Sequence, residues 1–346
     1  MSGRAGPFGG SLALMRTSLQ ELLATGRPLL ADGATGTNYF AAGLMSGDPP
    51  EFWTVDKPEE VTGLHQRFVD AGADIILTNT FGCNPHRLKL HKAEARTFEL
   101  AKAAAELARA VADAAPRPVV VAGSVGPTGE LFEPLGALTH DAAVAGFSDQ
   151  IRGLKAGGAD VVWIETMSAP EEVHAAATAA IENDMPYVAT CSFDTAGRTM
   201  MGVMPNQLSE ILAAEPVAPL AQGANCGVGA PDILVTVLEM QGATVPIVSK
   251  GNCGVPHFVG TEIVYTGTPE LMARYAGLAI DAGAQIVGGC CGTSPEHLAA
   301  MRAGIDAHVK GERPSVAQIV ESVGELTNSA PTANSGERRS RRTRGE

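Results

Sequence analysis

The chain has 346 residues, of which 45% are apolar and 18% charged, and its formal net charge is -13. This composition is that of a globular protein with a sizeable core, and an acidic body repels nucleic acid and acidic membranes. No apolar run approaches the roughly 18 residues of a membrane span, and the first residues show no clear secretory cleavage site, so we expect a cytoplasmic location.

Both ends of the chain have a composition typical of disorder. Residues 1–16 and 328–346 are rich in Gly, Ser, Thr and Arg, and the final stretch, SGERRSRRTRGE, contains five Arg. A short charged terminus is more often solvated than a binding site. We therefore expect one folded domain over residues 17–327 between two disordered segments, with no nucleic-acid or membrane partner.

A repeating unit fills the region between these ends. Short apolar runs rich in Val and Ile each end in small or polar residues, and most are followed by a longer helical pattern. Continuous apolar runs without alternation indicate strands buried on both faces, as in parallel sheets. The eight runs cover residues 28–37, 74–82, 118–127, 160–167, 187–194, 219–227, 246–254 and 284–293, and the helical patterns include 61–73, 94–115, 141–159, 169–183 and 268–284.

Eight βα units in about 300 residues predict an α/β fold of the (β/α)8 TIM-barrel type. The alternative is a doubly wound open sheet, but DGATGT after the first run lacks the GxGxxG spacing of a dinucleotide site. In a barrel, catalytic groups lie at the C-terminal ends of the strands. The residues expected to meet at that mouth are Asp32, Thr78, Asn79, Glu165, Asp194, Asn225, Cys226, Cys253, Cys290 and Cys291.

Two of the six cysteines, Cys290 and Cys291, stand side by side between glycines after the eighth run. Adjacent thiols at a strand end suit a soft metal better than a strained disulfide between neighbours. Cys226 follows the sixth run, and only one strand separates strands six and eight. Three cysteine ligands with one open position predict a catalytic zinc site.

The remaining cysteines have other expected roles. Cys253, after the seventh run, is the alternative fourth ligand that would close the site and make it structural. We expect it instead to be a buried neighbour. Cys83 and Cys191 have no Cys or His partner spaced nearby, so we expect both to be buried.

DGATGT, NTFG, a Glu at the end of the fourth strand, GANCG and GGCCGT, in this order, resemble the homocysteine S-methyltransferase family over about residues 20–310. The resemblance implies a (β/α)8 barrel, a zinc ion held by three cysteines, and homocysteine as methyl acceptor. The implied zinc ligands are Cys226, Cys290 and Cys291. The implied homocysteine contacts are Asp32, Gly33, Thr78 and Glu165.

The expected chemistry is alkyl transfer rather than hydrolysis. Three thiolates outweigh the charge of Zn²⁺, so electron density stays high on a substrate thiol that has lost its proton to the metal. Glu165 is expected to take the ammonium of homocysteine. Asp32 and the backbone N–H groups at Gly33 are expected to take the amino-acid end, and Thr78 to donate a hydroxyl hydrogen bond.

Three methyl donors fit this acceptor: glycine betaine, a sulfonium such as S-methylmethionine, and methylcobalamin on a separate protein. A cationic donor favours aromatic faces, and Trp53 and Phe81 are the aromatic candidates, with Asp194 in a polar loop at the same mouth. The chain is similar to stand-alone bacterial betaine–homocysteine methyltransferases, which favours betaine. It departs from the animal betaine enzymes at Gly82 and Thr166, where their pattern places Tyr.

We therefore predict methionine formation from homocysteine and betaine. The alternative from another class is a non-catalytic barrel whose zinc is closed by four cysteines, acting as a thiol sensor or as a subunit. A homo-oligomer is consistent with such a barrel, although the sequence carries no specific interface signal.

Overall fold

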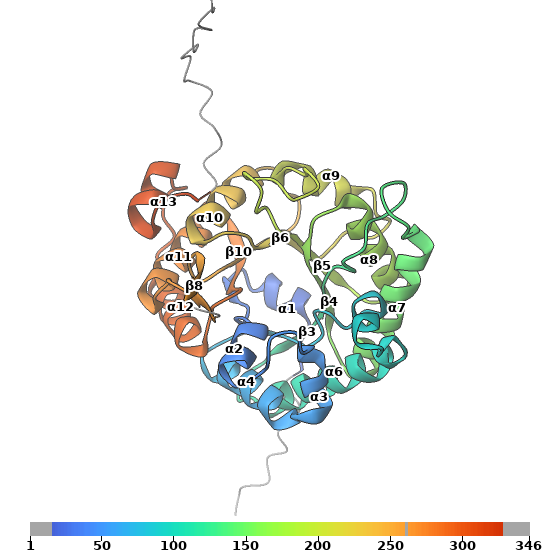
Figure 1. Cartoon of the computed structure of the whole chain (residues 1–346). Coiled ribbons are helices and arrows are strands. Elements are labelled where there is room, and N and C mark those ends of the chain that lie inside the picture. The colour runs from blue at the N-terminus through green and yellow to red at the C-terminus, as the bar shows by residue number, and fades with distance from the viewer. Residues whose placement is uncertain (1–15, 260–261, 328–346) are drawn as a thin grey trace, which may run out of the picture.

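The computed structural model describes residues 16–259 and 262–327. Eight parallel strands form a ring surrounded by helices, which is a (β/α)8 barrel (Figure 1). The sheet order is β1-β10-β7-β6-β5-β4-β3-β2, and a parallel bridge between Ala31 and Ile75 joins its two ends. The predicted barrel is confirmed, and the doubly wound open sheet is wrong. The strands are β1 (Leu29–Leu30), β2 (Ile75–Leu77), β3 (Val120–Val125), β4 (Val161–Met167), β5 (Tyr187–Cys191), β6 (Ala221–Cys226), β7 (Ile247–Gly251) and β10 (Ala284–Gly289).

Helices that follow the strands form the outer layer. Four of them begin with Pro, whose fixed φ and missing N–H suit the first helical position. In α7 and α11 the N-terminal cap is a threonine hydroxyl that accepts a backbone N–H bond. The helices are α4 (Pro58–Asp70), α6 (Thr97–Ala114), α7 (His140–Ala156), α8 (Pro170–Glu182), α9 (Leu208–Ala213), α10 (Ala230–Glu239), α11 (Pro269–Ala282), α12 (Pro295–Ala307) and α13 (Val316–Val323).

A short helix, α1 (Leu19–Ala24), packs onto the core inside the ring and is visible through its centre in Figure 1. It begins at Ser18, which forms a capping box with Glu21. Leu19 and Leu22 pack against the inward-facing side chains of the strands, among them Trp163. This apolar layer forms the floor beneath the opposite mouth of the barrel.

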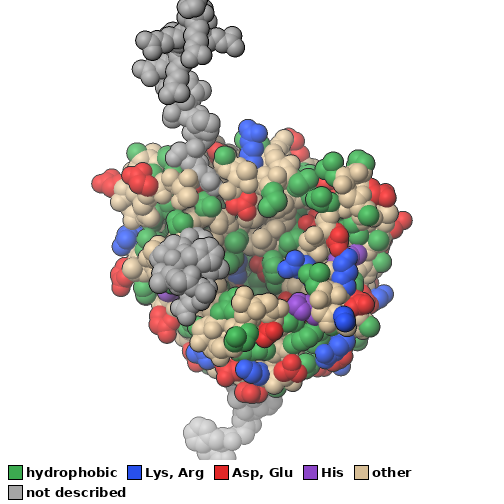
Figure 2. Space-filling view, viewed as in Figure 1, with side chains coloured by type: hydrophobic (Ala, Val, Ile, Leu, Met, Phe, Trp, Pro, Cys, Tyr) green, Lys and Arg blue, Asp and Glu red, His purple; other side chains and the backbone are tan. Residues whose placement is uncertain are grey.

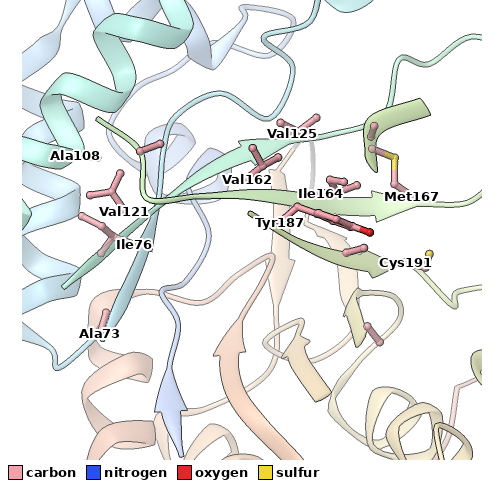
Figure 3. Close-up of a cluster of buried hydrophobic side chains, with 14 of the residues drawn as sticks. Ala73, Ile76, Ala108, Val121, Val125, Val162, Ile164, Met167, Tyr187 and Cys191 are labelled. Carbon is pink, nitrogen blue, oxygen red and sulfur yellow. The ribbon is translucent and has the colours of Figure 1, made fainter. Parts of the chain in front are cut away.

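A second apolar core separates the strands from the helices. Along β4, Val161 and Trp163 belong to the inner cluster, whereas Val162 and Ile164 belong to the outer one. Figure 3 shows part of the outer cluster, with side chains from β2 to β5. Because both faces of each strand are buried, the strands have continuous apolar sequences without alternation.

The segments after β1, β2, β5 and β7 carry further short elements. They include an antiparallel hairpin between β7 and α11, which the sequence analysis did not predict. The additional elements are α2 (Gly36–Ala41), η1 (Pro50–Phe52), α3 (Trp53–Asp56), α5 (Pro85–Leu88), η2 (Lys89–His91), η3 (Glu94–Arg96), η4 (Pro205–Gln207), β8 (Pro256–Val259) and β9 (Glu262–Tyr265).

The segments predicted to be disordered, 1–16 and 328–346, lie outside the described residues except for Arg16. The Arg16 Nε atom is 3.2 Å from Asp160 Oδ1. The boundaries of the folded domain therefore stay a prediction. Within the described part of the chain, none of the helices combines the length and apolar character that crossing a lipid bilayer demands.

Candidate metal and substrate site

The three cysteines of the predicted metal site lie together at the C-terminal ends of β6 and β10. Cys226 and Gly289 both pair with Gly251 of β7, so the two strands end at the same height in the barrel wall. The sulfur atoms of Cys226, Cys290 and Cys291 all lie within 4.8 Å of one another, and those of Cys226 and Cys291 are 4.0 Å apart. Tetrahedral zinc with Zn–S bonds of about 2.3 Å would separate its sulfurs by about 3.8 Å. The thiols therefore fit around one metal ion.

The electrostatics of this cluster point to the same kind of ligand. The pKa of the Cys290 thiol is raised by its hydrogen bond with Cys226 and, to a smaller extent, by burial and by the charge of Glu165. Three half-buried thiols packed together resist ionisation, because each thiolate disfavours the next. A bound cation would reverse this effect and hold all three as thiolates. The three thiols are thus a ligand set suited to a soft divalent metal ion.

Asn252, after β7, connects the two cysteine loops. Its Oδ1 atom accepts a hydrogen bond from the Cys291 backbone N–H at 3.0 Å, and its Nδ2 atom donates to the Gly227 carbonyl oxygen at 2.7 Å. The side chain is only 3% exposed. Cys226 itself has a φ of +63°, a left-handed conformation that costs a non-glycine residue about 1–3 kcal/mol unless its surroundings impose it. Asn252 fixes the chain directly after this strained residue.

A second amide, that of Asn225, supports the other side of the cluster. Its Oδ1 atom accepts from the Thr166 backbone N–H at 2.8 Å, and its Nδ2 atom donates to the Thr166 hydroxyl at 2.7 Å. The same Nδ2 atom lies 4.0 Å from the Cys290 sulfur. Thr166 also has a φ of +63°. Asn225 therefore ties the end of β4 to the cysteine cluster.

The hairpin that follows β7 covers one side of the thiols. The Tyr265 side chain, at the end of β9, lies next to the Cys291 side chain and influences the pKa of its thiol. Gly292 has a φ of +80°, and a Cβ atom there would lie 2.3 Å from the Tyr265 ring. The turn after the cysteine pair therefore requires glycine for both its conformation and its space.

The sulfurs of the other three cysteines lie outside the cluster, although the Cys253 backbone N–H donates to the Cys291 carbonyl oxygen at 2.9 Å. The Cys253 side chain donates a hydrogen bond to the Gly267 carbonyl oxygen, with the sulfur 3.2 Å from it, and is buried in the apolar core. Among residues 16–259 and 262–327, Cys226, Cys290 and Cys291 are the thiols that gather closely enough to share an ion. Cys83 and Cys191 are buried in the same core, as expected.

Asp32, at the end of β1, lies in a fully buried ion pair. Its Oδ1 atom is 2.8 Å from Lys250 Nζ, and its Oδ2 atom accepts from the Leu77 backbone N–H at 2.7 Å. Burial alone would lower the pKa of Lys250, but the charges of Asp32 and Glu165 outweigh it and hold that pKa above its ordinary value. Both oxygens of Asp32 thus have partners within the protein.

Glu165 and Thr78 belong to one hydrogen-bond network centred on Ser124. The Ser124 hydroxyl donates to the Glu165 carboxylate, and its backbone N–H donates to the Thr78 hydroxyl at 3.0 Å. Burial raises the pKa of Glu165, and Lys250 opposes that shift. The Thr80 hydroxyl donates its proton to the Ser124 carbonyl oxygen. In the 2.6 Å contact between the Thr78 and Thr80 hydroxyls, Thr78 is therefore the donor. Thr78 is left with an acceptor lone pair rather than a donor.

The glycine-rich turn after β1 packs directly against the loop that carries the cysteine pair. The Ala34 backbone N–H donates to the Thr293 carbonyl oxygen at 3.2 Å, and a Cβ atom at Gly33 would lie 2.6 Å from that oxygen. The two motifs DGATGT and GGCCGT are therefore neighbours in space. In the space-filling view the centre of the ring is hollowed (Figure 2).

Comparison with known proteins identifies the family. A family model described as homocysteine S-methyltransferase matches residues 29–305. The chain belongs to the homocysteine S-methyltransferase family. It is 30% identical over 335 residues to methionine synthase from Mycobacterium leprae and 28% identical over 333 residues to that from Mycobacterium tuberculosis. These matches cover 89% and 90% of this chain but only 27% and 28% of the relatives, so the chain spans about a quarter of their length.

A solved structure shows the same fold. The homocysteine methyltransferase MmuM from Escherichia coli, in its metallated form, superposes with a TM-score of 0.70 at 25% identity. The match covers 82% of this chain and 99% of MmuM. The oxidized form of MmuM matches with a TM-score of 0.69. The metallated form belongs to MmuM, and in this member of the family the three-thiol cluster could hold a metal ion.

The residues considered for the donor lie in the segments that follow β1, β2 and β5 of this family member, and they differ in accessibility. Trp53 is 7% exposed, packs on Tyr39, and already has the Lys57 ammonium 4.2 Å from its ring centroid. Phe81 is 40% exposed. Asp194 accepts hydrogen bonds from the hydroxyls of neighbouring serine and threonine side chains. Phe81 is thus the more accessible of the two aromatic rings.

Several residues of this family member were missed by the sequence analysis. Lys250, Asn252, Ser124 and Tyr265 each contact a predicted site residue. A lysine inside the apolar run PIVSKG was a usable signal, because a charge buried at a strand end requires a partner. Ser124 and Tyr265 carry no comparable signal, since their roles depend on which strands and loops become neighbours.

Proposed function

We propose that the protein transfers a methyl group from a small donor to the thiol of homocysteine, giving methionine, with zinc held by Cys226, Cys290 and Cys291. The observation that carries this proposal is the convergence of three sulfurs within 4.8 Å at the barrel mouth of a chain from this family. Bound zinc would supply one thing, a lowered pKa of the acceptor thiol, so that its sulfur is present as the thiolate at neutral pH.

The chain's own residues bind and orient the amino-acid end of the acceptor. Glu165, oriented by Ser124, accepts the ammonium. The remaining lone pair of Thr78 faces the same group, while Asp32 acts at this end together with Lys250. Backbone N–H groups of the turn at Gly33 approach the carboxylate. Because this turn packs on the cysteine loop, the same contacts bring the acceptor sulfur to the thiol cluster.

The donor we propose is glycine betaine, which the likeness to stand-alone bacterial enzymes favours. Its quaternary ammonium would contact the exposed ring of Phe81, and Asp194, after β5, is the acidic candidate for the donor site. Trp53 is the second aromatic candidate, although the Lys57 ammonium already lies over its ring. S-methylmethionine and a separate methylcobalamin protein are the alternative donors. The cytoplasmic location and a homo-oligomeric state remain predictions.

The deciding experiment measures methionine formed by zinc-loaded protein from homocysteine and one of three donors, with metal-stripped protein as control. Methionine from betaine alone supports the full proposal. Methionine only with S-methylmethionine or methylcobalamin keeps the acceptor and the metal and replaces the donor. No methionine with any donor refutes the enzymatic proposal.

The non-catalytic alternative requires Cys253 as a fourth zinc ligand. Its sulfur lies instead against the Gly267 carbonyl oxygen, outside the three-thiol cluster. This position favours a metal with an open coordination site. If zinc were bound by four protein sulfurs and added thiol did not change its coordination, the sensor or subunit role would be supported instead.

A further inference from the structure

Lys250 is a buried cation that the mechanism above uses only as the partner of Asp32. Its side chain is 2% exposed, and that of Asp32 is 1% exposed. The next most buried pair within the described ranges, Arg109 with Asp160, has side chains 10% and 8% exposed. A buried charge pair costs several kcal/mol of desolvation per ion, so a position of this kind calls for a reason beyond stability.

The path of this side chain leads to the floor of the site. Lys250 is on β7, and its Nζ atom crosses the barrel interior to reach Asp32 on the far side of β10. The stem passes Gly288, where a Cβ atom would lie 3.0 Å from the Lys250 Cγ atom. The ammonium then lies 5.8 Å from the Trp163 ring centroid, above the inner apolar layer.

At that position the Lys250 ammonium has N–H donors that are not used in hydrogen bonds. A lysine carries three N–H donors, and Asp32 takes one of them. In residues 16–259 and 262–327 no other acceptor is found within hydrogen-bond distance of Nζ. The charge of Glu165 also acts on this ammonium. A cation with unused donors therefore lies beside Asp32 and within electrostatic reach of Glu165, the carboxylate that we assign to the substrate ammonium.

We propose that Lys250 binds the carboxylate of the acceptor and, with Glu165, makes the site selective for a zwitterionic thiol. The inference rests on the proposed function, because it adds a charged partner for the same substrate carboxylate that the backbone N–H groups at Gly33 approach. The ammonium and carboxylate of an α-amino acid share one carbon atom, so their partners must be neighbours of opposite charge. Glu165 and Lys250 meet this requirement, and Asp32 acts by holding Lys250 in place.

The test measures binding of methionine, the zwitterionic product, by calorimetry, so that it needs neither catalysis nor a donor. Two analogues each lack one charge: 3-(methylthio)propylamine has no carboxylate, and 4-(methylthio)butanoate has no ammonium. Lys250→Met is expected to weaken the binding of methionine and of the butanoate about 10- to 100-fold. This is the usual contribution of one charge-assisted hydrogen bond. Binding of the propylamine is expected to stay unchanged or to tighten.

A second variant separates this role from simple neutralisation of Asp32. Asp32→Asn combined with Lys250→Met leaves no buried charge unpaired and keeps an acceptor for the Leu77 N–H. The proposal predicts that this double variant still binds methionine weakly. Recovery of wild-type affinity would mean that Lys250 serves only to neutralise Asp32. Lys102→Met is the matched control, since it removes a surface lysine that pairs with Glu106 on α6 and should leave all three affinities unchanged.

The outcomes also separate the two proposals. Wild-type protein that binds neither methionine nor homocysteine refutes the proposed function and this inference together. The role of Lys250 alone is refuted if wild-type protein forms methionine and Lys250→Met weakens the binding of methionine and of the propylamine equally.

Discussion

Replacing Asn252 by alanine is expected to weaken the metal site without removing any thiol. The substitution deletes an acceptor 3.0 Å from the Cys291 N–H and a donor 2.7 Å from the Gly227 carbonyl oxygen. Each backbone group left buried without a partner costs about 1–3 kcal/mol, so the free energy of unfolding is expected to fall by about 2–6 kcal/mol. Because the two loops carry Cys226 and Cys291, zinc affinity is expected to fall about 10- to 100-fold.

Two assays separate these effects. Urea unfolding of metal-free protein gives the free energy of unfolding, and competition with a chromophoric chelator gives the zinc dissociation constant. Asn183→Ala is the matched control, because the Asn183 side chain also makes two hydrogen bonds. It donates at 3.1 Å to the Ser148 hydroxyl and at 2.7 Å to the Ala179 carbonyl oxygen, at the end of α8. If both variants bind zinc as tightly as wild type, Asn252 does not position the cysteine loops.

Four further expectations follow from other parts of the structure. Gly292→Ala should lower both stability and zinc affinity, because its φ is +80° and the new Cβ would meet Tyr265; an unchanged affinity would contradict the role of this turn. Cys253→Ser should keep one zinc per chain by elemental analysis while Cys226→Ser loses it, and equal losses would favour a closed site. Phe81→Leu should raise the KM for betaine about 3- to 10-fold and leave the KM for homocysteine unchanged, and steady-state kinetics with each substrate varied checks this. Burial lowers the pKa of His65 to about 4 from 6.5, so the unfolded chain takes up its proton first as the pH falls. The free energy of unfolding should therefore drop by about 3 kcal/mol between about pH 6.5 and pH 4, and urea unfolding should find no such contribution in His65→Phe.

The cysteine cluster was predictable from sequence because barrel topology is regular. Parallel strands that occupy alternate positions end at similar heights, so Cys226 and the pair after β10 had to face each other once eight βα units were recognised. The location of Asp32 and Glu165 at strand ends followed from the same rule. The partners of Asp32 and Glu165 could not be predicted in this way, because sequence spacing does not indicate which side chain extends through the barrel interior to contact them.

The limits of the sequence analysis are clearest at Thr78 and in the hairpin after β7. The position of Thr78 was predicted, but the direction of its hydroxyl bond depends on Thr80 and Ser124, which the chain brings together only on folding. The run PHFVGTEIVY contains two strand-like segments, but it falls between a strand and a helix of the βα repeat, and the sequence analysis assigned it no structure. Tyr265 therefore escaped attention although it contacts Cys291.

X-ray absorption at the zinc edge, with and without homocysteine, tests the central claim most directly. The account predicts three sulfur neighbours and one lighter atom in zinc-loaded protein, and four sulfur neighbours after homocysteine is added. Cys226→Ser should bring the starting value down to two sulfurs or abolish binding. Four sulfurs before any thiol is added, with no change afterwards, would contradict an open site at Cys226, Cys290 and Cys291.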